Sequence, residues 1–197
     1  MSEVRILVVY AHPLETSFIA ALHLRAVETL RAGGHEVDDL DLYAERFDPV
    51  MSREQFAHYV DARVNTREVE SYVKRLRTAE ALVLVFPVWF DGLPAMMQGY
   101  FQRVFLPGVA LRIDEAGLFH PTLWNLKRMA AVCTYGESRR DVAAKNNPAH
   151  RFVRYNIGLL IDPKGRFEYL AHYDMNFSTA ARREAFMRRV TRAFEKW

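Results

Sequence analysis

Short apolar runs recur along the chain and alternate with segments whose apolar residues have helical spacing. The runs lie at 4–10, 81–86, 128–134 and 167–173, and a weaker one at 36–42 alternates apolar with acidic positions. Branched, nearly continuous apolar runs of this length are typical of strands buried on both faces of a parallel sheet. The pattern therefore predicts five strands.

Four amphipathic segments lie between and after these runs. They are at 18–30, 69–76, 95–105 and 179–197, and the first follows Thr16 and Ser17 and stops at Gly33. Hydroxyl residues at the start and glycine at the end are typical helix boundaries. The alternation predicts a single α/β domain over 1–197 with a doubly wound parallel sheet. Ligands of such sheets bind beyond the carboxyl ends of the strands.

Composition narrows the class of protein. The chain has 197 residues, half of them hydrophobic, and a formal net charge of +3. The longest apolar run, 81–90, is far shorter than the roughly 18–20 residues of a membrane span, and no secretory signal pattern opens the chain. We therefore expect a cytoplasmic protein that neither inserts into membranes nor binds nucleic acid. The lone Cys133 can form neither an internal disulfide nor a cysteine-based metal cage.

The loop after the first predicted strand carries the first candidate chemistry. Its polar and aromatic residues directly precede a helix, whose free N–H groups attract phosphate: His12, Thr16, Ser17 and Phe18. An ordinary helix cap with an incidental histidine is the alternative. The glycine fingerprints of dinucleotide-binding and P-loop proteins are absent from the sequence.

Two further loops follow the third and fourth predicted strands. The third strand is expected to end at Pro87, and Val88, Trp89 and Phe90 then form an apolar wall on which a flat ring could stack. The alternative is that Trp89 and Phe90 plug the core beneath the loop. After the fourth strand, Thr134, Tyr135 and Gly136 could offer backbone N–H groups to an anionic ligand edge.

Three motifs at these loops resemble one family. They are AHPLETSF at 11–18, PVWFDGLPAMMQGYFQRVF at 87–105 and TYG at 134–136, and they are similar to the flavodoxin-like NAD(P)H dehydrogenase (quinone) family. The resemblance implies a five-stranded parallel sheet in the order 2-1-3-4-5 with helices on both faces. It also implies a homodimer that binds FAD, or alternatively FMN, and transfers hydride from NAD(P)H to a quinone by a ping-pong mechanism.

The resemblance also assigns residues to parts of the flavin. His12, Thr16, Ser17 and Phe18 would hold the phosphates, and Pro87, Val88, Trp89 and Phe90 would run along the isoalloxazine ring. Thr134, Tyr135 and Gly136 would face its pyrimidine side. No catalytic acid is carried over, because the tyrosine and histidine that flank the hydride-transfer site in this family have no convincing match in the sequence after Gly136.

Two departures from the family pattern change the expected site. Ile19 stands where these reductases often have asparagine, and Asp91 stands where an aromatic residue is usual. Asp91 would make the rim more polar and could repel anionic substrates. A regulatory flavoprotein subunit that senses redox state and binds a transporter remains the alternative function, whereas a flavodoxin-type electron carrier is disfavoured because such carriers are usually acidic.

Two other segments receive structural interpretations. His172, Tyr173 and Asp174 end the fifth predicted strand, and we expect them to lie away from the crevice between the first and third strands and to make structural or dimer contacts. The segment 106–124 is too long for a simple connection. It either covers the ligand site or reaches a partner subunit, and its composition does not decide between these two.

Overall fold

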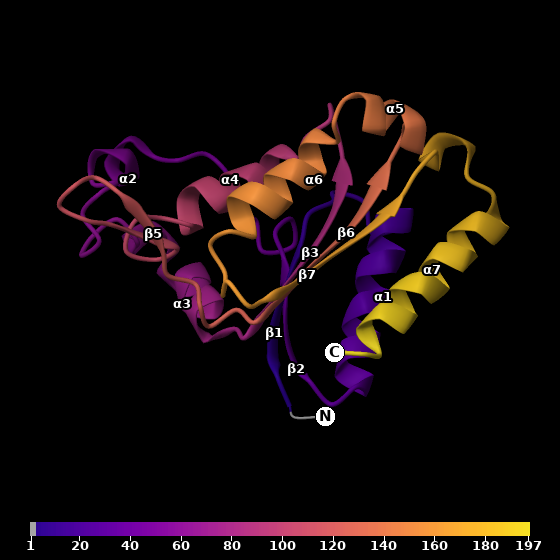
Figure 1. Cartoon of the computed structure of the whole chain (residues 1–197), viewed down its shortest axis with the longest axis horizontal. Helices are drawn as coiled ribbons and strands as arrows, with labels where there is room; N and C mark the ends of the chain where they lie inside the picture. The colour runs from indigo at the N-terminus through magenta and orange to yellow at the C-terminus, as the bar shows by residue number, and fades with distance from the viewer. Residues whose placement is uncertain (1–2) are drawn as a thin grey trace.

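Five parallel strands form the central sheet of the computed structural model, which describes residues 3–197 (Figure 1). Their order is β2-β1-β3-β6-β7, with bounds β1 (Arg5–Tyr10), β2 (Glu36–Asp41), β3 (Ala81–Val88), β6 (Arg128–Tyr135) and β7 (Arg166–His172). Numbered as the main strands alone, this is the predicted order 2-1-3-4-5. The predicted flavodoxin-like α/β fold is confirmed.

Helices cover both faces of the sheet. On one face lie α1 (Phe18–Ala32) and α7 (Ala180–Phe194), and on the other lie α3 (Glu70–Thr78), α4 (Ala95–Val104) and α6 (Pro148–Phe152) (Figure 1). Successive side chains of a strand point to opposite faces. In β1, Ile6 and Val8 therefore pack with α1 and α7, while Leu7 and Val9 pack on the other side.

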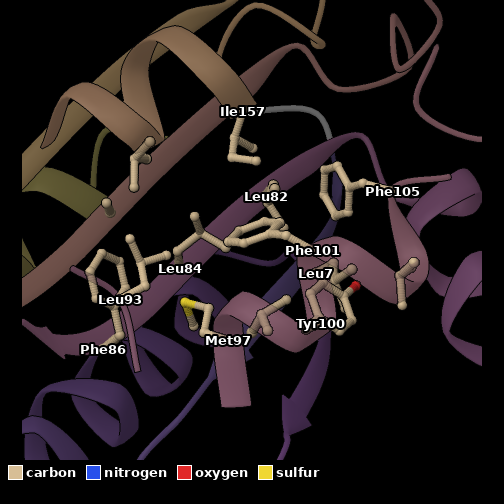
Figure 2. Close-up of a cluster of buried hydrophobic side chains, with 14 of the residues drawn as sticks. Leu7, Leu82, Leu84, Phe86, Leu93, Met97, Tyr100, Phe101, Phe105 and Ile157 are labelled. Carbon is tan, nitrogen blue, oxygen red and sulfur yellow. The ribbon is translucent and has the colours of Figure 1, made fainter. Parts of the chain in front are cut away.

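The core beneath α4 holds the central strands in place. Met97, Tyr100 and Phe101 of this helix lie against Leu82 and Leu84 of β3 (Figure 2). Burying each such side chain contributes about 1.5–3 kcal/mol. Because α4 begins directly after the loop that follows β3, this packing gives that loop a rigid base.

The third strand is longer than the sequence predicts. It continues through Pro87 to Val88, in register with Thr134 and Tyr135 of β6. The Val85 carbonyl oxygen accepts a hydrogen bond from the N–H of Ala11, the residue after β1. Two residues further along β3, the backbone nitrogen of Pro87 points to the same side of the strand. Because β1 has ended there, the missing N–H of Pro87 costs no ladder bond.

Several short elements have no clear signal in the sequence. They are α2 (Arg53–Ala57), α5 (Arg139–Ala144), the hairpin of β4 (Leu111–Ile113) and β5 (Phe119–Pro121), and the single turns η1 (Arg67–Val69), η2 (Val153–Ile157) and η3 (Met175–Phe177). Buried Arg103 secures the irregular region around α2, because it donates to Gln55 at 2.8 Å and to Glu68 at 2.6 Å. No helix within 3–197 has the length and apolar character required to cross a bilayer.

Candidate functional site

The loop after β1 ends in a helix start with unused backbone donors. The Ser17 hydroxyl accepts from the Ala20 N–H at 3.2 Å and caps α1. Within the described residues, the N–H groups of Phe18 and Ile19 have no hydrogen-bond acceptor. Free N–H groups and the positive end of a 15-residue helix favour an anion here.

His12 and Thr16 lie on the same loop but differ in their surroundings. The His12 Nδ1 lies 3.0 Å from the Leu14 backbone nitrogen and 3.1 Å from the Leu14 carbonyl oxygen, so this nitrogen is held by its own loop. Thr16 is exposed and Ser17 half-buried. Ile19, by contrast, is 3% exposed and packs in the core under α1, so this departure from the family changes a buried side chain and leaves the loop surface as it was.

The loop after β3 is a tight hairpin turn with an unusual backbone. Trp89 and Gly92 exchange two backbone hydrogen bonds of 3.1 and 2.9 Å, and the two residues between them have φ of 48° and 60°. Left-handed conformations at both central positions define a type I′ turn, in which Asn and Gly are usual. Here they are Phe90 and Asp91, and a bulky aromatic residue at positive φ points to a functional constraint.

Trp89 and Phe90 do not belong to the core. Trp89 is 42% exposed and Phe90 is fully exposed, so the interpretation that they plug the core is wrong. The Trp89 ring lies 5.7 Å from the His12 ring, centroid to centroid, at 53°. The structure therefore brings the loops after β1 and β3 together, as expected for neighbouring parallel strands. Pro87 is buried within the strand and Val88 is half-buried at its end.

The loop after β6 presents mainly backbone. The Tyr135 side chain is buried, where its hydroxyl contacts Asn147 Oδ1 at 2.7 Å and the Tyr169 hydroxyl at 2.6 Å. Burial raises the pKa of Tyr135 far above its ordinary value, so the phenol stays protonated. Thr134 is also buried and Gly136 is exposed. A Cβ at Gly136 would lie 3.3 Å from the Asn176 amide nitrogen, so a side chain would crowd this loop.

Salt bridges that the sequence does not reveal join the loops after β3 and β6. Lys145 Nζ lies 3.0 Å from Asp91 and 2.6 Å from Glu137, and these hydrogen bonds, first to Glu137 and then to Asp91, raise the pKa of Lys145. The lysine offsets the charge of Asp91, which weakens the predicted repulsion of anionic substrates. Sequence spacing alone could not pair these groups, because 54 residues separate Lys145 from Asp91.

The end of β7 approaches the start of α1. The His172 ring lies 5.4 Å from the Phe18 ring, and His172 Nε2 contacts the Ser178 hydroxyl at 2.8 Å. His172 therefore contacts the residue that opens α1, and its distance from the crevice between β1 and β3 stays a prediction. Burial, followed by the nearby Arg182 and Arg183, lowers the pKa of His172. A buried, neutral histidine makes a structural contact, as expected.

Comparison with known proteins agrees with this arrangement. Residues 4–161 match a family described by its flavodoxin-like fold. The chain belongs to this family. Its sequence is 34% identical over 122 residues to NAD(P)H dehydrogenase [quinone] 1 of Rattus norvegicus, covering 54% of this chain and 44% of the relative. It is 38% identical over 130 residues to an uncharacterized NAD(P)H oxidoreductase of Escherichia coli, covering 63% and 64%.

The alignments to these relatives therefore extend over roughly half to two thirds of their length.

Solved structures share the fold over nearly the whole chain. An NAD(P)H:quinone oxidoreductase from Methanothermobacter marburgensis has a TM-score of 0.85 at 21% identity and 98% coverage of both chains. An FMN-dependent NADH-azoreductase from Bacillus anthracis, in complex with FMN, has 0.78 at 13% identity and 98% coverage of both. The resemblance inferred from the loop motifs is confirmed.

Proposed function

We propose that this chain is a flavin-dependent NAD(P)H:quinone oxidoreductase. The observation that carries the proposal is the left-handed turn that holds Phe90 fully exposed beside Trp89 and His12. The names of the relatives from Rattus norvegicus and Methanothermobacter marburgensis support the same reaction. FAD is the proposed cofactor, and FMN is the alternative because the similar azoreductase was solved with FMN.

The residues present fit a flavin. The unpaired N–H groups of Phe18 and Ile19 suit a phosphate. The exposed rings of Trp89 and Phe90 suit the face of a flat tricyclic ring, since offset aromatic stacking contributes about 0.5–1.5 kcal/mol beyond area burial. Gly136 leaves room for the backbone of its loop to approach the edge of that ring.

The chemistry that a bound flavin supplies is hydride transfer from NAD(P)H to a quinone in two half-reactions, which gives ping-pong kinetics. The protein orients the ring and stabilises charge. The backbone N–H groups at 134–136 are the proposed donors to the negative charge that develops on the pyrimidine edge. The His12 ring lies beside Trp89, 5.7 Å between centroids, and is proposed to contact the bound flavin.

The site is tested by replacing both exposed rings. Trp89→Ala combined with Phe90→Ala is expected to lower the flavin content of the purified protein, measured by absorbance after heat release. The matched control is Phe56→Ala with Tyr155→Ala, which removes two exposed aromatic rings from α2 and η2. Full flavin occupancy in the Trp89/Phe90 variant, or an equal loss in the control, would contradict the placement.

The reaction is tested by steady-state assays with NADH, NADPH and a benzoquinone. We expect rapid turnover and parallel lines in double-reciprocal plots, because donor and acceptor occupy one site in turn. Chromatography of the released cofactor identifies it as FAD or FMN. Negligible turnover together with tight nucleotide binding would contradict the enzyme and favour a regulatory subunit.

The proposal includes a homodimer. The hairpin of β4 and β5, within the segment 106–124, exposes the apolar side chains of Ile113, Leu118 and Phe119, and Trp124 is 55% exposed nearby. Asp114 orders the hairpin by accepting from the Leu118 N–H at 2.9 Å. An ordered hairpin with exposed apolar side chains is typical of a surface that packs against another protein.

A further inference from the structure

A cleft of about 810 Å³ lies at the end of the molecule opposite the ligand loops. Its walls come from the first residues of β6 and β7 and from the last turns of α7, close to the C-terminus marked in Figure 1. The loops after β1, β3 and β6 lie at the carboxyl ends of the strands, whereas this cleft lies at the amino ends. It is therefore separate from the proposed flavin site.

Cationic side chains dominate the lining of this cleft, which we call the basic cleft. Among the described residues that line it, Glu168 is the one acidic side chain beside six basic ones, so the lining side chains carry a net charge of +5. Among residues 3–197, none of the six cations has a carboxylate within 4.0 Å. The six are Arg128, Arg154, Arg166, Arg189, Arg192 and Lys196.

Two strands and a helix gather most of these charges. Arg128 and Arg166 are in register on adjacent strands, where like charges repel. Arg189 and Arg192 lie three residues apart on one side of α7, and Lys196 follows just after the end of that helix. Repulsion among neighbouring cations is unfavourable without a counter-charge, and an anion in the basic cleft would remove that repulsion.

Two arginines of the same helix outside the basic cleft have carboxylate partners. Arg188 lies 3.0 Å from Glu184, and Arg182 lies 3.2 Å from Asp174. A third, Arg183, donates instead to the Ser178 carbonyl oxygen at 3.0 Å. Within the described residues of α7, the arginines that do have carboxylate partners lie outside the cleft face, which argues against an ordinary solvated surface at the basic cleft.

We propose that the basic cleft binds a small molecule that carries several phosphate groups. Its volume lies within the range of roughly 300–1,000 Å³ that is usual for small-molecule sites. A cleft of this volume is too small to enclose a folded protein. Guanidinium groups match phosphate oxygens in bidentate geometry, and several phosphates are needed to balance a lining of this charge. Half-buried Phe167 adds apolar lining that suits the uncharged part of a nucleotide.

The test is isothermal titration of the full, flavin-loaded chain with tripolyphosphate, with ATP and with inorganic phosphate at constant ionic strength. We expect saturable one-to-one binding of the first two and at least about tenfold weaker binding of inorganic phosphate. Equal affinity for tripolyphosphate and ATP assigns recognition to the phosphate chain. Tighter binding of ATP than of tripolyphosphate would show that the apolar lining contacts the nucleoside.

Charge-reversal variants locate the binding. R189E/R192E is expected to weaken binding at least about tenfold and to leave the flavin content unchanged, because the proposed flavin site lies at the opposite edge. The control R53E/R67E makes the same change in net charge at exposed positions of α2 and η1 and is expected to bind as the parent does. R166Q removes a cation from β7 instead, so weaker binding by this variant excludes a folding defect of α7 as the cause.

Two results would overturn the proposal. One is the absence of saturable binding of either polyphosphate. The other is equal weakening by R189E/R192E and R53E/R67E, which would mean that net charge alone attracts the anion. Neither result bears on the flavin, which is measured separately by its absorbance.

Discussion

Phe90 is a residue whose backbone and side chain are both unfavourable in the free protein. Its φ of 48° places an aromatic residue in the left-handed region, and its side chain is fully exposed. The left-handed conformation costs an L-residue about 1–2 kcal/mol. Burial of the ring against a ligand would offset the exposure, which is why we assign Phe90 to the flavin site.

Phe90→Gly should therefore separate stability from function. Glycine adopts positive φ without steric cost, so the variant is expected to gain up to about 1 kcal/mol of unfolding free energy without flavin. The same variant is expected to retain less flavin because the ring is lost. Urea denaturation of the flavin-free protein and absorbance of the purified protein measure the two effects.

Phe56→Gly is the matched control for this variant. Phe56 is also exposed but lies in the helix α2, so glycine there relieves no strain and should cost about 0.5–1 kcal/mol. A loss of stability in Phe90→Gly that equals the loss in Phe56→Gly would show that the turn stores no strain.

At the scale of one element, the first turn of α1 contributes both to the stability of the protein and to the proposed flavin site. Ser17 caps its start, and the same turn presents the free N–H groups that suit a phosphate. A second helix of 15 residues, α7, is capped in the same way by Thr179, whose hydroxyl accepts from the Arg182 N–H at 3.3 Å. The two helices pack on the same face of the sheet, which makes them a matched pair.

Ser17→Ala and Thr179→Ala are each expected to lower the unfolding free energy by about 1 kcal/mol, the usual effect of a lost N-cap. Only Ser17→Ala is expected to lower flavin content as well, because Thr179 caps a helix that the flavin site does not use. Thermal unfolding and flavin absorbance measure the two effects. An equal effect of both variants on flavin content would assign the change to general destabilisation.

At the scale of the whole molecule, the hairpin of β4 and β5 exposes its apolar side chains on the side where α2 and α3 lie (Figure 1). In the proposed homodimer, Phe119→Asp places a charge in the interface and should shift the protein from dimer to monomer. Burying an unpaired charge is costly. Light scattering after size-exclusion chromatography measures the mass.

Leu24→Asp introduces the same charge at an exposed position of α1, on the other face of the sheet, and serves as the control. A monomeric parent protein would contradict the proposed homodimer. A Phe119→Asp variant that remains dimeric would place the interface elsewhere on the surface.

Local pattern was sufficient for the main elements. The five strands and the main helices follow from apolar periodicity and from caps such as Ser17, because these signals act between residues close in the sequence. The loop motifs were likewise sufficient to propose Trp89 and Phe90 as ligand residues. Gly99 shows the limit of such signals, since a Cβ there would lie 2.2 Å from the Pro49 carbonyl oxygen, a contact between distant segments.

The sequence by itself determined the alternation of strands and helices, and with it the sheet edge where a ligand would bind. Tertiary structure decided which side chains meet there: the Lys145 bridge between Asp91 and Glu137, the turn inward of Tyr135, and the approach of His172 to Phe18. It also gathered the cations of the basic cleft from four separate segments. The apolar periodicity of the sequence indicates the secondary structure of each segment. Charge pairing and burial depend instead on neighbours from other segments, which only the folded chain provides.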